Sequence, residues 1–378
     1  MPKSIKFAVI THVNHIKNGN QYFGYAPYVR EMNIWLKNVD ELIVVAPVIT
    51  KIPTLIDLPY QHDKIDFKEV PDFSFISIKE IVRALFRFPI IFWKVFWAMK
   101  QADHIHLRCP GNMGLIACFV QVLFPQKEKT AKYAGNWDPK SKQPWTYKLQ
   151  KYILNNTFLT KNIKVLVYGE WKNQSKNIVP FFTATYSESE KNIVRKEPFN
   201  SGIEFIFAGT LAEGKNPLYA IKLVEQLLEK GFDIVLNLYG EGIQRNILET
   251  YIKSNKLDDS VFLHGNQNQA TIKQAFQKSH FVFLPSKSEG WPKAIAEGMF
   301  WGCFPVATKV SCVPFMLADE ERGLLLEMDL EQDVLELEKA IKDELTYGLK
   351  SEKALLWSRK YTLEIFEEEI KKILHHEA

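Results

Sequence analysis

Residues 281–308 read FVFLPSKSEGWPKAIAEGMFWGCFPVAT, and this stretch decides the fold. The apolar run 281–285 predicts a short buried strand, and a polar loop follows it as far as Gly290. Pro292 indicates the start of a helix, because a proline at the first helical position lacks only an N–H that has no partner there. A second apolar run from Cys303 predicts another strand. This order of strand, loop, helix and strand is typical of a parallel α/β sheet.

Two carboxylates flank the predicted helix start, Glu289 in the loop and Glu297 eight positions later. Eight helical positions turn the chain through roughly 800°, about 80° more than two full turns, so both carboxylates can face one ligand. The backbone N–H groups that follow Glu289 would form an anion site at the helix N-terminus. An anion site beside two acceptors for hydroxyl groups suits a sugar nucleotide.

The length and composition constrain the number of domains and the kinds of partner that we expect. A chain of 378 residues exceeds the usual size of a single core, so we expect two domains. The net charge of +4 is mildly basic, which argues against a nucleic-acid partner but fits an anionic membrane surface if the charge is clustered. The four cysteines show no metal-ligand spacing, and we expect reduced buried thiols and no metal site.

The chain also predicts a cytoplasmic location. The first ten residues, MPKSIKFAVI, run directly into a strand rather than into a signal peptide. The longest apolar run, 85–99, is interrupted by Arg87, Pro89 and Lys94 and is too short to cross a bilayer. We therefore expect a cytoplasmic protein, free or at the inner face of the cytoplasmic membrane.

The first half of the chain alternates between predicted strands and helices. Strands are expected at 5–10, 42–48, 104–109, 131–135 and 163–168, with a helix at 27–37. A long polar loop, 12–25, follows the first strand and contains His12 and His15. Because parallel sheets bind ligands beyond the carboxyl ends of their strands, this loop is a functional candidate. For each histidine taken alone, a solvated loop position is favoured over a catalytic role.

Residues 78–100, IKEIVRALFRFPIIFWKVFWAMK, are the most unusual segment of this half. Large aromatic residues interleave with arginine and lysine throughout it. A basic helix rich in Trp and Phe is typical of a helix that lies in a bilayer interface. A core helix that carries a few long cationic side chains is the alternative, and the sequence leaves both open.

The second half repeats the same order of elements. The polar segment 187–200 marks the boundary, so we predict domains at 1–190 and 201–356 and a C-terminal helix at 357–378. Strands are expected at 203–208, 233–239 and 261–264, each followed by glycine, and an amphipathic helix at 357–374. Glycine at a strand end permits a positive φ or the close approach of another backbone.

Three segments of this half carry a resemblance to a known family: FAGTLAEGK (207–215), LYGEG (238–242) and SEGWPKAIAEG (288–298). In this order they resemble the retaining glycosyltransferases of family 4, which have the GT-B fold. HLRCPG (106–111) and KYAGNWDP (132–139) match more loosely. The resemblance implies two Rossmann-like parallel α/β domains that face each other across a cleft. It also implies a C-terminal helix that crosses back to the first domain.

The resemblance assigns roles to residues that match the motifs. It implies that Glu289 holds the donor sugar, Glu297 the ribose and Lys215 the diphosphate. Gly209 and Thr210 belong to the first motif, where the family has arginine at the position of Thr210. Arg108 and Lys293 are candidate substitutes for that missing cation.

Further donor contacts are expected from the backbone N–H groups of Gly290, Trp291 and Lys293. Gly240 and Gly242 would line the base or the ribose, or simply form a turn. From the first domain His106 and Arg108 could approach the sugar or phosphate, although His106 could also be a core histidine.

The implied activity is that of a metal-independent, cofactor-free retaining hexosyltransferase. It would move a sugar from a UDP- or GDP-type donor to a lipid-linked or growing surface glycan. A GT-B enzyme of different chemistry, such as an epimerase or a phosphorylase, is one alternative, although no pyridoxal phosphate signature is evident. A sugar-nucleotide-binding subunit without activity is another, and Thr210 favours it.

Overall fold

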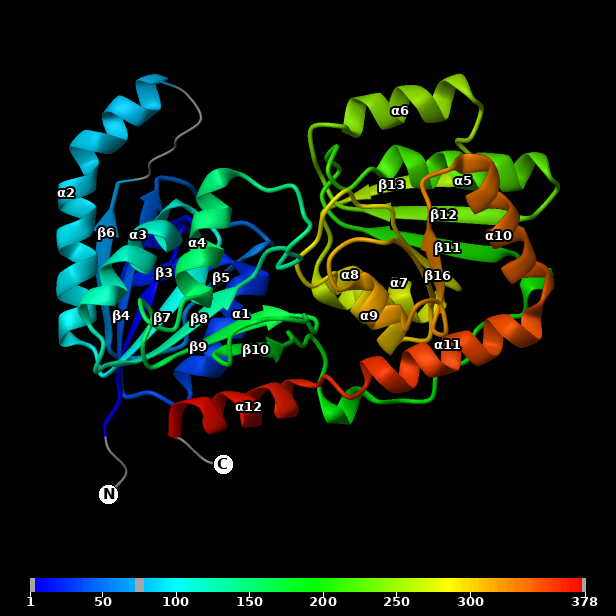
Figure 1. Cartoon of the computed structure of the whole chain (residues 1–378). Helices are drawn as coiled ribbons and strands as arrows, with labels where there is room; N and C mark the ends of the chain where they lie inside the picture. Colours follow the sequence, from blue (N-terminus) through cyan, green and yellow to red (C-terminus); the bar gives the residue numbers. More distant parts are fainter. Residues whose placement is uncertain (1–3, 72–77, 376–378) are drawn as a thin grey trace. The chain divides into compact units, whose positions relative to one another are not determined.

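The structure is a computed structural model that describes residues 4–71 and 78–375. The chain divides into two compact units (Figure 1). The first contains the chain up to Phe182 together with the residues from Glu367 onwards, and the second is Thr183–Phe366. This division precedes the polar segment 187–200 in which the sequence places the boundary.

A largely parallel sheet forms the centre of the first unit. Its order is β10-β9-β8-β7-β1-β4, and β6 also pairs with β4. The bounds of these strands are β1 Lys6–Ile10, β4 Glu41–Ile49, β6 Ile65–Val70, β7 His104–Cys109, β8 Glu128–Tyr133, β9 Ile163–Tyr168 and β10 Ile178–Phe181. The chain builds the sheet outward from β1 in both directions, so the strand order reverses between β1 and β7. Such a reversal is the switch point at which doubly wound sheets bind ligands.

The predicted polar loop after β1 contains a small antiparallel addition to this sheet. Its strands are β2 His15–Asn18, β3 Gln21–Tyr25 and β5 Asp57–Pro59. Gly19 has φ +59°, and Asn18 pairs with Gln21, so Gly19 and Asn20 form a two-residue hairpin turn. The prediction of an irregular loop over 12–25 was therefore wrong for most of its length.

Helices α1 Ala26–Leu36, α2 Ile78–Gln101, α3 Asn112–Val120 and α4 Trp145–Asn155 complete this unit, with a 3₁₀ turn at Gln121–Leu123. The light blue α2 runs along the outer side of the sheet (Figure 1). It packs on the core through Ile91, Val95, Ala98 and Met99, while Phe92 and Phe96 lie partly buried beside them.

The other face of α2 is exposed. Phe86 is 79% exposed, Trp93 57% and Trp97 41%, and Ile90 lies between them. Spacings of four, three and four positions place these four side chains on one helical stripe. Packing against the core thus accounts for one face of α2 and leaves the other unexplained.

The second unit contains a wholly parallel sheet of order β13-β12-β11-β14-β15-β16. Its strands are β11 Ile203–Ala208, β12 Ile234–Tyr239, β13 Val261–Gly265, β14 Phe281–Leu284, β15 Phe304–Thr308 and β16 Leu324–Leu326. Numbered along the chain, the order is 3-2-1-4-5-6, which is that of dinucleotide-binding sheets. The switch point lies between β11 and β14.

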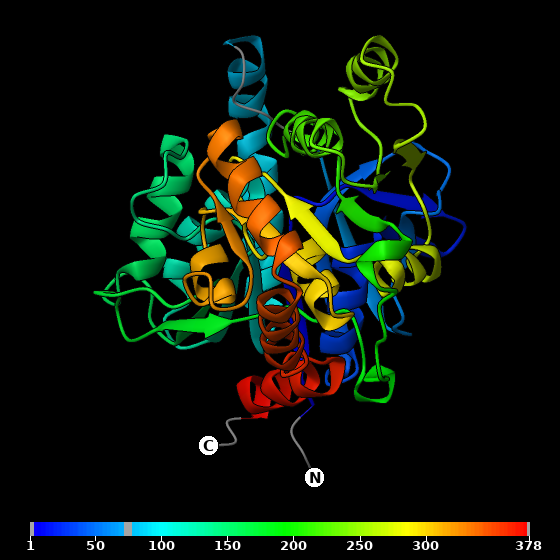
Figure 2. The same ribbon diagram turned by 90° about the vertical axis from the view of Figure 1, so that its right-hand side faces the viewer.

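Helices cover both faces of this second sheet (Figures 1 and 2). They are α5 Pro217–Glu229, α6 Arg245–Ser254, α7 Gln269–Lys278, α8 Lys293–Phe300, α9 Val313–Leu317, α10 Leu330–Lys342 and α11 Glu344–Ser358. Two 3₁₀ turns, Glu188–Glu190 and Phe199–Ser201, precede β11. The core beneath α5 and α10 is aromatic, with Phe205 and Phe281 stacked 4.6 Å apart.

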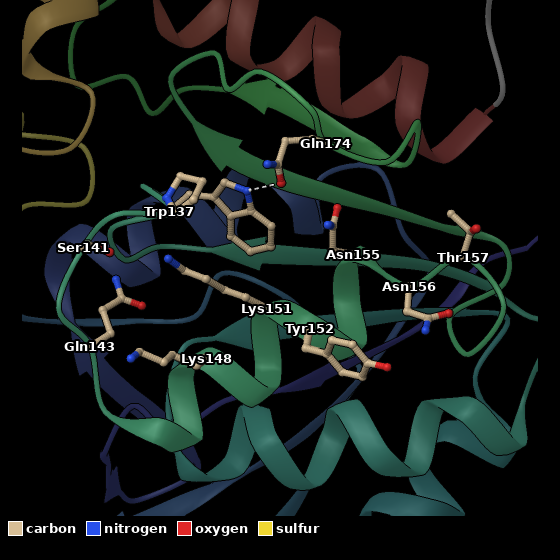
Figure 3. Close-up of a pocket in the computed structure, with 11 residues that line it drawn as sticks. Trp137, Ser141, Gln143, Lys148, Lys151, Tyr152, Asn155, Asn156, Thr157 and Gln174 are labelled. Atoms are coloured by element: carbon tan, nitrogen blue, oxygen red, sulfur yellow. Dashed lines mark hydrogen bonds between the residues drawn. The ribbon is translucent and has the colours of Figure 1, made fainter.

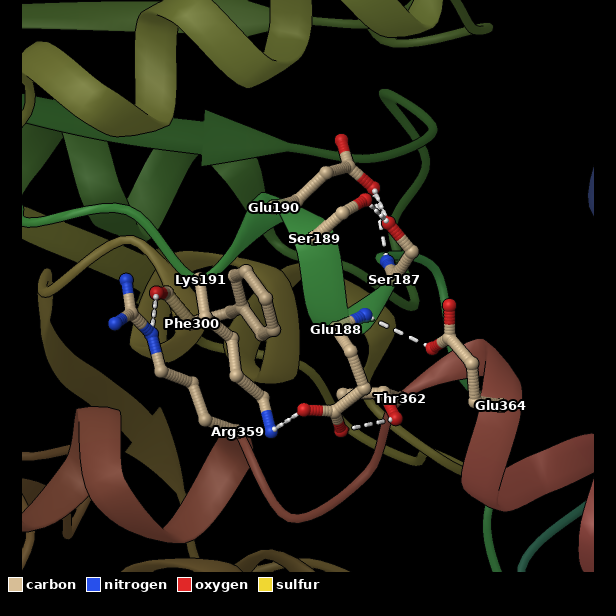
Figure 4. A network of polar contacts seen from close by, with 9 residues as sticks. All are labelled: Ser187, Glu188, Ser189, Glu190, Lys191, Phe300, Arg359, Thr362 and Glu364. Carbon is tan, nitrogen blue, oxygen red and sulfur yellow. Dashed lines mark hydrogen bonds and ion pairs between the residues drawn. The ribbon is translucent and has the colours of Figure 1, made fainter.

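The prediction of one helix over 357–374 was wrong. Helix α11 ends at Ser358, and α12 Leu363–His375 begins after a turn. The Leu363 N–H donates to the Tyr186 carbonyl (3.0 Å), and the buried Thr362 hydroxyl donates to Glu188 (2.7 Å). These contacts take the place of helical hydrogen bonds (Figure 4). From Glu367 onwards α12 belongs to the first unit, where Glu367 pairs with Lys37 (3.0 Å), as expected for a crossing C-terminal helix.

Candidate functional site

Two loops meet at the switch point of the second unit. One follows β11 and contains Lys215, and the other follows β14 and contains Glu289. The Lys215 ammonium lies 2.6 Å from the Glu289 carboxylate. Glu289 is only 7% exposed, whereas the Lys215 side chain retains 32% of its surface. The structure therefore brings together the two residues for which the sequence predicts contacts with the donor sugar and diphosphate.

Further contacts fix the two loops relative to each other. The Lys287 N–H donates to the Gly214 carbonyl (2.8 Å), and the Lys287 ammonium pairs with Glu213 (2.6 Å). The Thr308 hydroxyl at the end of β15 donates to the Ser286 carbonyl. Because the backbones are joined directly, the positions of Lys215 and Glu289 do not depend on their own ion pair.

The glycines that follow β12 are required by the close packing of two backbone segments. The loop after β12 packs on the loop after β11, with Gly209 N–H donating to Tyr239 O (2.9 Å) and Leu211 N–H to Glu241 O (3.0 Å). A Cβ atom on Gly240 would lie 1.9 Å from the Gly209 carbonyl oxygen. One on Gly242 would lie 2.2 Å from the Leu211 carbonyl oxygen. Both positions exclude a side chain whether or not a nucleotide binds there, and their contact with base or ribose stays a prediction.

The loop that carries Glu289 leads into α8, which begins at Lys293, one residue after the predicted start. The Gly290 carbonyl accepts hydrogen bonds from the Ser311 hydroxyl (3.3 Å) and the Cys312 thiol (3.2 Å). The Trp291 side chain is buried against Trp357, with ring centroids 6.1 Å apart. The side chain of Trp291 thus packs at the helix start, and the backbone contact that the sequence predicts for this residue stays a prediction.

Glu297, the second carboxylate of the motif, lies on α8 and accepts a hydrogen bond from the Thr185 hydroxyl (2.8 Å). Lys293 and Glu297 line the same small cavity beside Thr185 and Tyr186. Burial raises the pKa of the Tyr186 hydroxyl, and the nearby Glu297 charge raises it further. The exposed Thr210 adds no cation to this site, so Lys293 remains the candidate substitute within the second unit.

The structure corrects the expectation for His106. This residue is fully buried on β7, where Nδ1 lies 2.8 Å from the Thr130 hydroxyl. Its ring packs against Phe7 (5.6 Å between centroids) and Trp35 (4.7 Å). Burial holds the pKa of His106 well below its usual range, so it is neutral at pH 7. His106 is a core histidine, and a contact with sugar or phosphate does not fit this placement.

Arg108 is also not the free cation that the sequence suggests. It is almost fully buried and forms an ion pair with Glu31 of α1. Its guanidinium also lies over the Tyr28 ring, 5.1 Å from the centroid. Since Glu31 already neutralises this charge, Arg108 does not replace the arginine missing at Thr210. No spacing in the sequence could reveal this pair, because 77 positions separate its members.

The two histidines after β1 have different environments. His12 is exposed and lies against Gly111 at the switch point of the first unit, where a Cβ on Gly111 would lie 2.7 Å from His12 Nδ1. His15 is fully buried, which excludes a solvated loop position for it. Its Nε2 atom lies 2.9 Å from the Tyr60 hydroxyl, which in turn donates to Tyr28 (3.1 Å). Burial lowers the pKa of His15 to about 4.

Among residues 4–71 and 78–375, no group of His, Cys, Asp and Glu side chains could hold a metal ion. Cys109, Cys118, Cys303 and Cys312 are buried free thiols. Within the same ranges no helix has the length and apolar character needed to span a bilayer.

Solved structures define the class of this fold. Sucrose-phosphate synthase from Thermosynechococcus elongatus superposes with a TM-score of 0.69 at 14% identity, and 98% of each chain is covered. HepE from Anabaena, solved in complex with UDP, gives a TM-score of 0.69 at 14% identity over 99% of this chain and 100% of its own. The chain has the GT-B fold of glycosyltransferases.

The sequence of the second unit resembles a known family. Residues 189–355 match the family of glycosyl transferases group 1. Protein CapJ of Staphylococcus aureus is 23% identical over 63% of this chain and 61% of its own length. The chain thus spans about three fifths of this curated relative. The Lys215–Glu289 pair lies inside the matched region.

Proposed function

We propose that this protein is a glycosyltransferase that moves a sugar from a nucleoside-diphosphate sugar to a hydroxyl group of an acceptor. The observation that carries the proposal is the ion pair of Lys215 and Glu289 at the switch point of a dinucleotide-type sheet. The likeness to HepE, which was solved with UDP, and the match to group 1 support a nucleotide-sugar donor.

Each residue of the pair has a chemical role in this proposal. The Glu289 carboxylate accepts hydrogen bonds from donor sugar hydroxyls, and such charge-assisted bonds are about twice as strong as neutral ones. The Lys215 ammonium neutralises the diphosphate as the bond from the anomeric carbon to the phosphate oxygen breaks. Glu297, beside Thr185, accepts hydrogen bonds from the ribose hydroxyls.

The proposed reaction retains the anomeric configuration and uses no metal. The acceptor oxygen forms a bond to the anomeric carbon on the face from which the nucleoside diphosphate leaves. The leaving phosphate takes the acceptor proton. Catalysis then rests on positioning and on charge stabilisation by Lys215, with Lys293 as the second cation in place of the arginine replaced by Thr210.

Donor turnover tests this proposal. Purified protein is incubated with UDP- and GDP-hexoses, and the release of nucleoside diphosphate and the fate of the sugar are followed. The Glu289→Gln variant should lose about 10- to 150-fold in kcat/KM, the loss of one hydrogen bond to a charged group. Glu213→Gln is the matched control, since Glu213 belongs to the same pair of loops but is 77% exposed.

The outcomes separate the alternatives. Equal activity of Glu289→Gln and wild type would contradict the role of this carboxylate. Binding of a donor without any turnover would favour a sugar-nucleotide-binding subunit, and Thr210 would then be the feature that explains it. A donor recovered as its epimer, without release of nucleoside diphosphate, would identify an enzyme of different chemistry.

We also propose that α2 holds the protein at the inner face of the cytoplasmic membrane, where a lipid-linked or growing surface glycan is the acceptor. The exposed stripe Phe86, Ile90, Trp93 and Trp97 supports this, and the cations Lys94 and Lys100 flank it. The Lys100 ammonium lies 4.5 Å from the centre of the Trp97 ring. An aromatic stripe with flanking cations suits an anionic lipid surface.

Liposome flotation tests the membrane contact. Wild type should float with phosphatidylglycerol vesicles, and the Phe86→Ser, Trp93→Ser, Trp97→Ser variant should remain at the bottom of the gradient. The control carries Trp145→Ser and Phe158→Ser, which remove similarly exposed aromatic residues elsewhere in the first unit. Equal flotation of wild type and the triple variant would refute the contact.

A further inference from the structure

A polar pocket of about 690 Å³ lies in the first unit, apart from the residues discussed so far (Figure 3). It lies between α4, the loop that follows β8 and the loop that follows β9. Its size is within the range of small-molecule sites. The sequence motif 132–139 passes through it, since Trp137 and Pro139 belong to its wall.

The amide oxygens of Asn155 and Asn156 in this pocket are engaged within the protein. The Asn155 amide oxygen accepts from the Ser175 N–H (3.1 Å) and hydroxyl (2.7 Å). The Asn156 amide oxygen accepts from the N–H groups of Phe158 (3.0 Å) and Leu159 (3.1 Å). These contacts fix both amides so that their NH₂ groups are the ends left for a ligand.

The Gln174 amide is engaged as well. Its oxygen accepts from the Trp137 indole N–H (3.0 Å), and its nitrogen donates to the Lys172 carbonyl (3.2 Å). The indole is thereby held against the wall of the pocket in Figure 3. The amide oxygens of Asn155, Asn156 and Gln174 thus all accept hydrogen bonds within the protein.

Two ammonium groups add positive charge to these donors. Lys148 and Lys151 lie three positions apart on α4 and therefore on one face of the helix. None of the described residues that line the pocket is acidic. The Asp138 carboxylate, whose charge acts on Lys151, is not part of this lining and accepts from the Lys140 N–H (2.8 Å). Lys151 itself donates to the Asp138 carbonyl (3.2 Å) and lies over the Tyr133 and Trp137 rings.

The environment of Lys151 leaves its charge poorly solvated. Partial burial lowers the pKa of this ammonium to about 8, and the Asp138 charge opposes that shift only in part. An anion in the pocket would relieve the loss of solvation. Tyr152, next along α4, is 64% exposed and offers a ring face at the pocket rim. Aromatic rings that carry a polar group are suited to contacts with sugars, which have both apolar and polar faces.

We propose that this pocket binds an acidic saccharide, a sugar unit that carries a carboxylate or phosphate, as part of the acceptor glycan. The NH₂ groups of Asn155 and Asn156 bind sugar hydroxyls, Lys148 and Lys151 bind the anionic substituent, and Tyr152 packs on the ring. The assignment of the saccharide to the acceptor rests on the proposed function. The binding of an acidic sugar rests on the pocket alone.

Ligand-observed NMR with the full chain tests the inference. The probes are a disaccharide of glucuronic acid and glucose, the neutral disaccharide cellobiose, and inorganic phosphate. The acidic disaccharide should bind at least about 10-fold more tightly than cellobiose, the effect of one charge-assisted contact of about 1.5 kcal/mol. The Lys148→Gln, Lys151→Gln variant should abolish this preference. Tyr152→Ala should weaken the binding of the acidic disaccharide and leave the binding of inorganic phosphate unchanged.

A Lys161→Gln, Lys164→Gln variant is the matched control, because both lysines are exposed in the first unit and line a different pocket. Equal binding of the acidic and neutral disaccharides would overturn the inference. An equal loss of affinity for the acidic disaccharide in the two double variants would also overturn it. Binding of inorganic phosphate alone would show an anion site without saccharide recognition, and would also overturn it. Donor turnover by the same wild-type sample is measured in parallel. Turnover without saccharide binding refutes only the pocket, and saccharide binding without turnover refutes only the proposed function.

Discussion

Replacement of Gly240 by alanine tests how the donor loops of the second unit are assembled. The new methyl carbon would lie 1.9 Å from the Gly209 carbonyl oxygen, whereas ordinary contacts begin near 3.4 Å. The loops must therefore separate by more than 1 Å. This movement would disturb the bonds from Gly209 N–H to Tyr239 O and from Gly240 N–H to Gly265 O, both 2.9 Å.

Three contributions set the expected loss of stability. Overpacking against a rigid backbone costs about 1–3 kcal/mol. The φ of +140° at Gly240 adds about 1–2 kcal/mol for a residue with a side chain. Weakening one of the two backbone hydrogen bonds adds about 1 kcal/mol. The sum of about 3–6 kcal/mol should lower the melting temperature of the second unit by about 6–24 °C, at about 2–4 °C per kcal/mol for a unit of this size.

Differential scanning calorimetry without nucleotide is the assay, since it resolves the melting of separate units. Gly214→Ala is the matched control: it lies in the loop after β11, on which the loop of Gly240 packs, and a Cβ there meets no atom within 4 Å. Its stability should change by no more than about 0.5–1 kcal/mol. The structural reasoning is refuted if Gly240→Ala and Gly214→Ala have the same melting temperature and Gly240→Ala loses only nucleotide binding. Gly240 would then be required for contact with the nucleotide and not for the packing of the loops.

Three further outcomes are expected. Thr362→Ala should lower the melting temperature of the second unit through the loss of one part-buried hydrogen bond from the buried Thr362 to Glu188, about 1–3 kcal/mol, and unchanged melting by calorimetry would contradict this. His106→Gln should lower the melting temperature and leave donor turnover within about threefold, whereas a loss above about 100-fold would restore a catalytic role. Burial lowers the pKa of His15 in the folded state to about 4, so between pH 6.5 and pH 4 this histidine takes up a proton only in the unfolded chain. The free energy of unfolding of the first unit should therefore fall by about 3 kcal/mol as the pH is lowered from 6.5 to 4. Acid unfolding of His15→Gln checks this, and an identical pH profile would refute it.

The sequence predicts the second unit well for a physical reason. The central strands β11 and β14 are largely buried, so they appear as the apolar runs 203–208, interrupted only at Glu204, and 281–284, which are closed by glycine and proline. Lys215 and Glu289 follow two of these runs, and the motif order therefore locates the site. Their ion pair could not be predicted, because it depends on β11 and β14 being neighbours in the sheet.

The errors arise where tertiary contacts override a local pattern. The amphipathic period continues through 357–374, and the break at Thr362 comes from hydrogen bonds to residues about 175 positions earlier, which no local pattern contains. His106 and Arg108 lie on the expected strand, but their partners come from β8 and α1. The hairpin turn at Gly19 and Asn20 is different, since glycine followed by asparagine between two strands is a hairpin signal that the sequence does contain.

Calorimetric titration of UDP and GDP into the full chain tests the central claim most directly, with Lys215→Gln compared against Lys287→Gln. Both variants lose one lysine from the same pair of loops, but Lys287 pairs with the exposed Glu213 rather than with Glu289. One of the two nucleotides should bind wild type, and Lys215→Gln should weaken its binding by about 10- to 100-fold through loss of a charge-assisted contact. Lys287→Gln should stay within about threefold of wild type. The claim is contradicted if neither nucleotide binds wild type, or if the two variants bind alike.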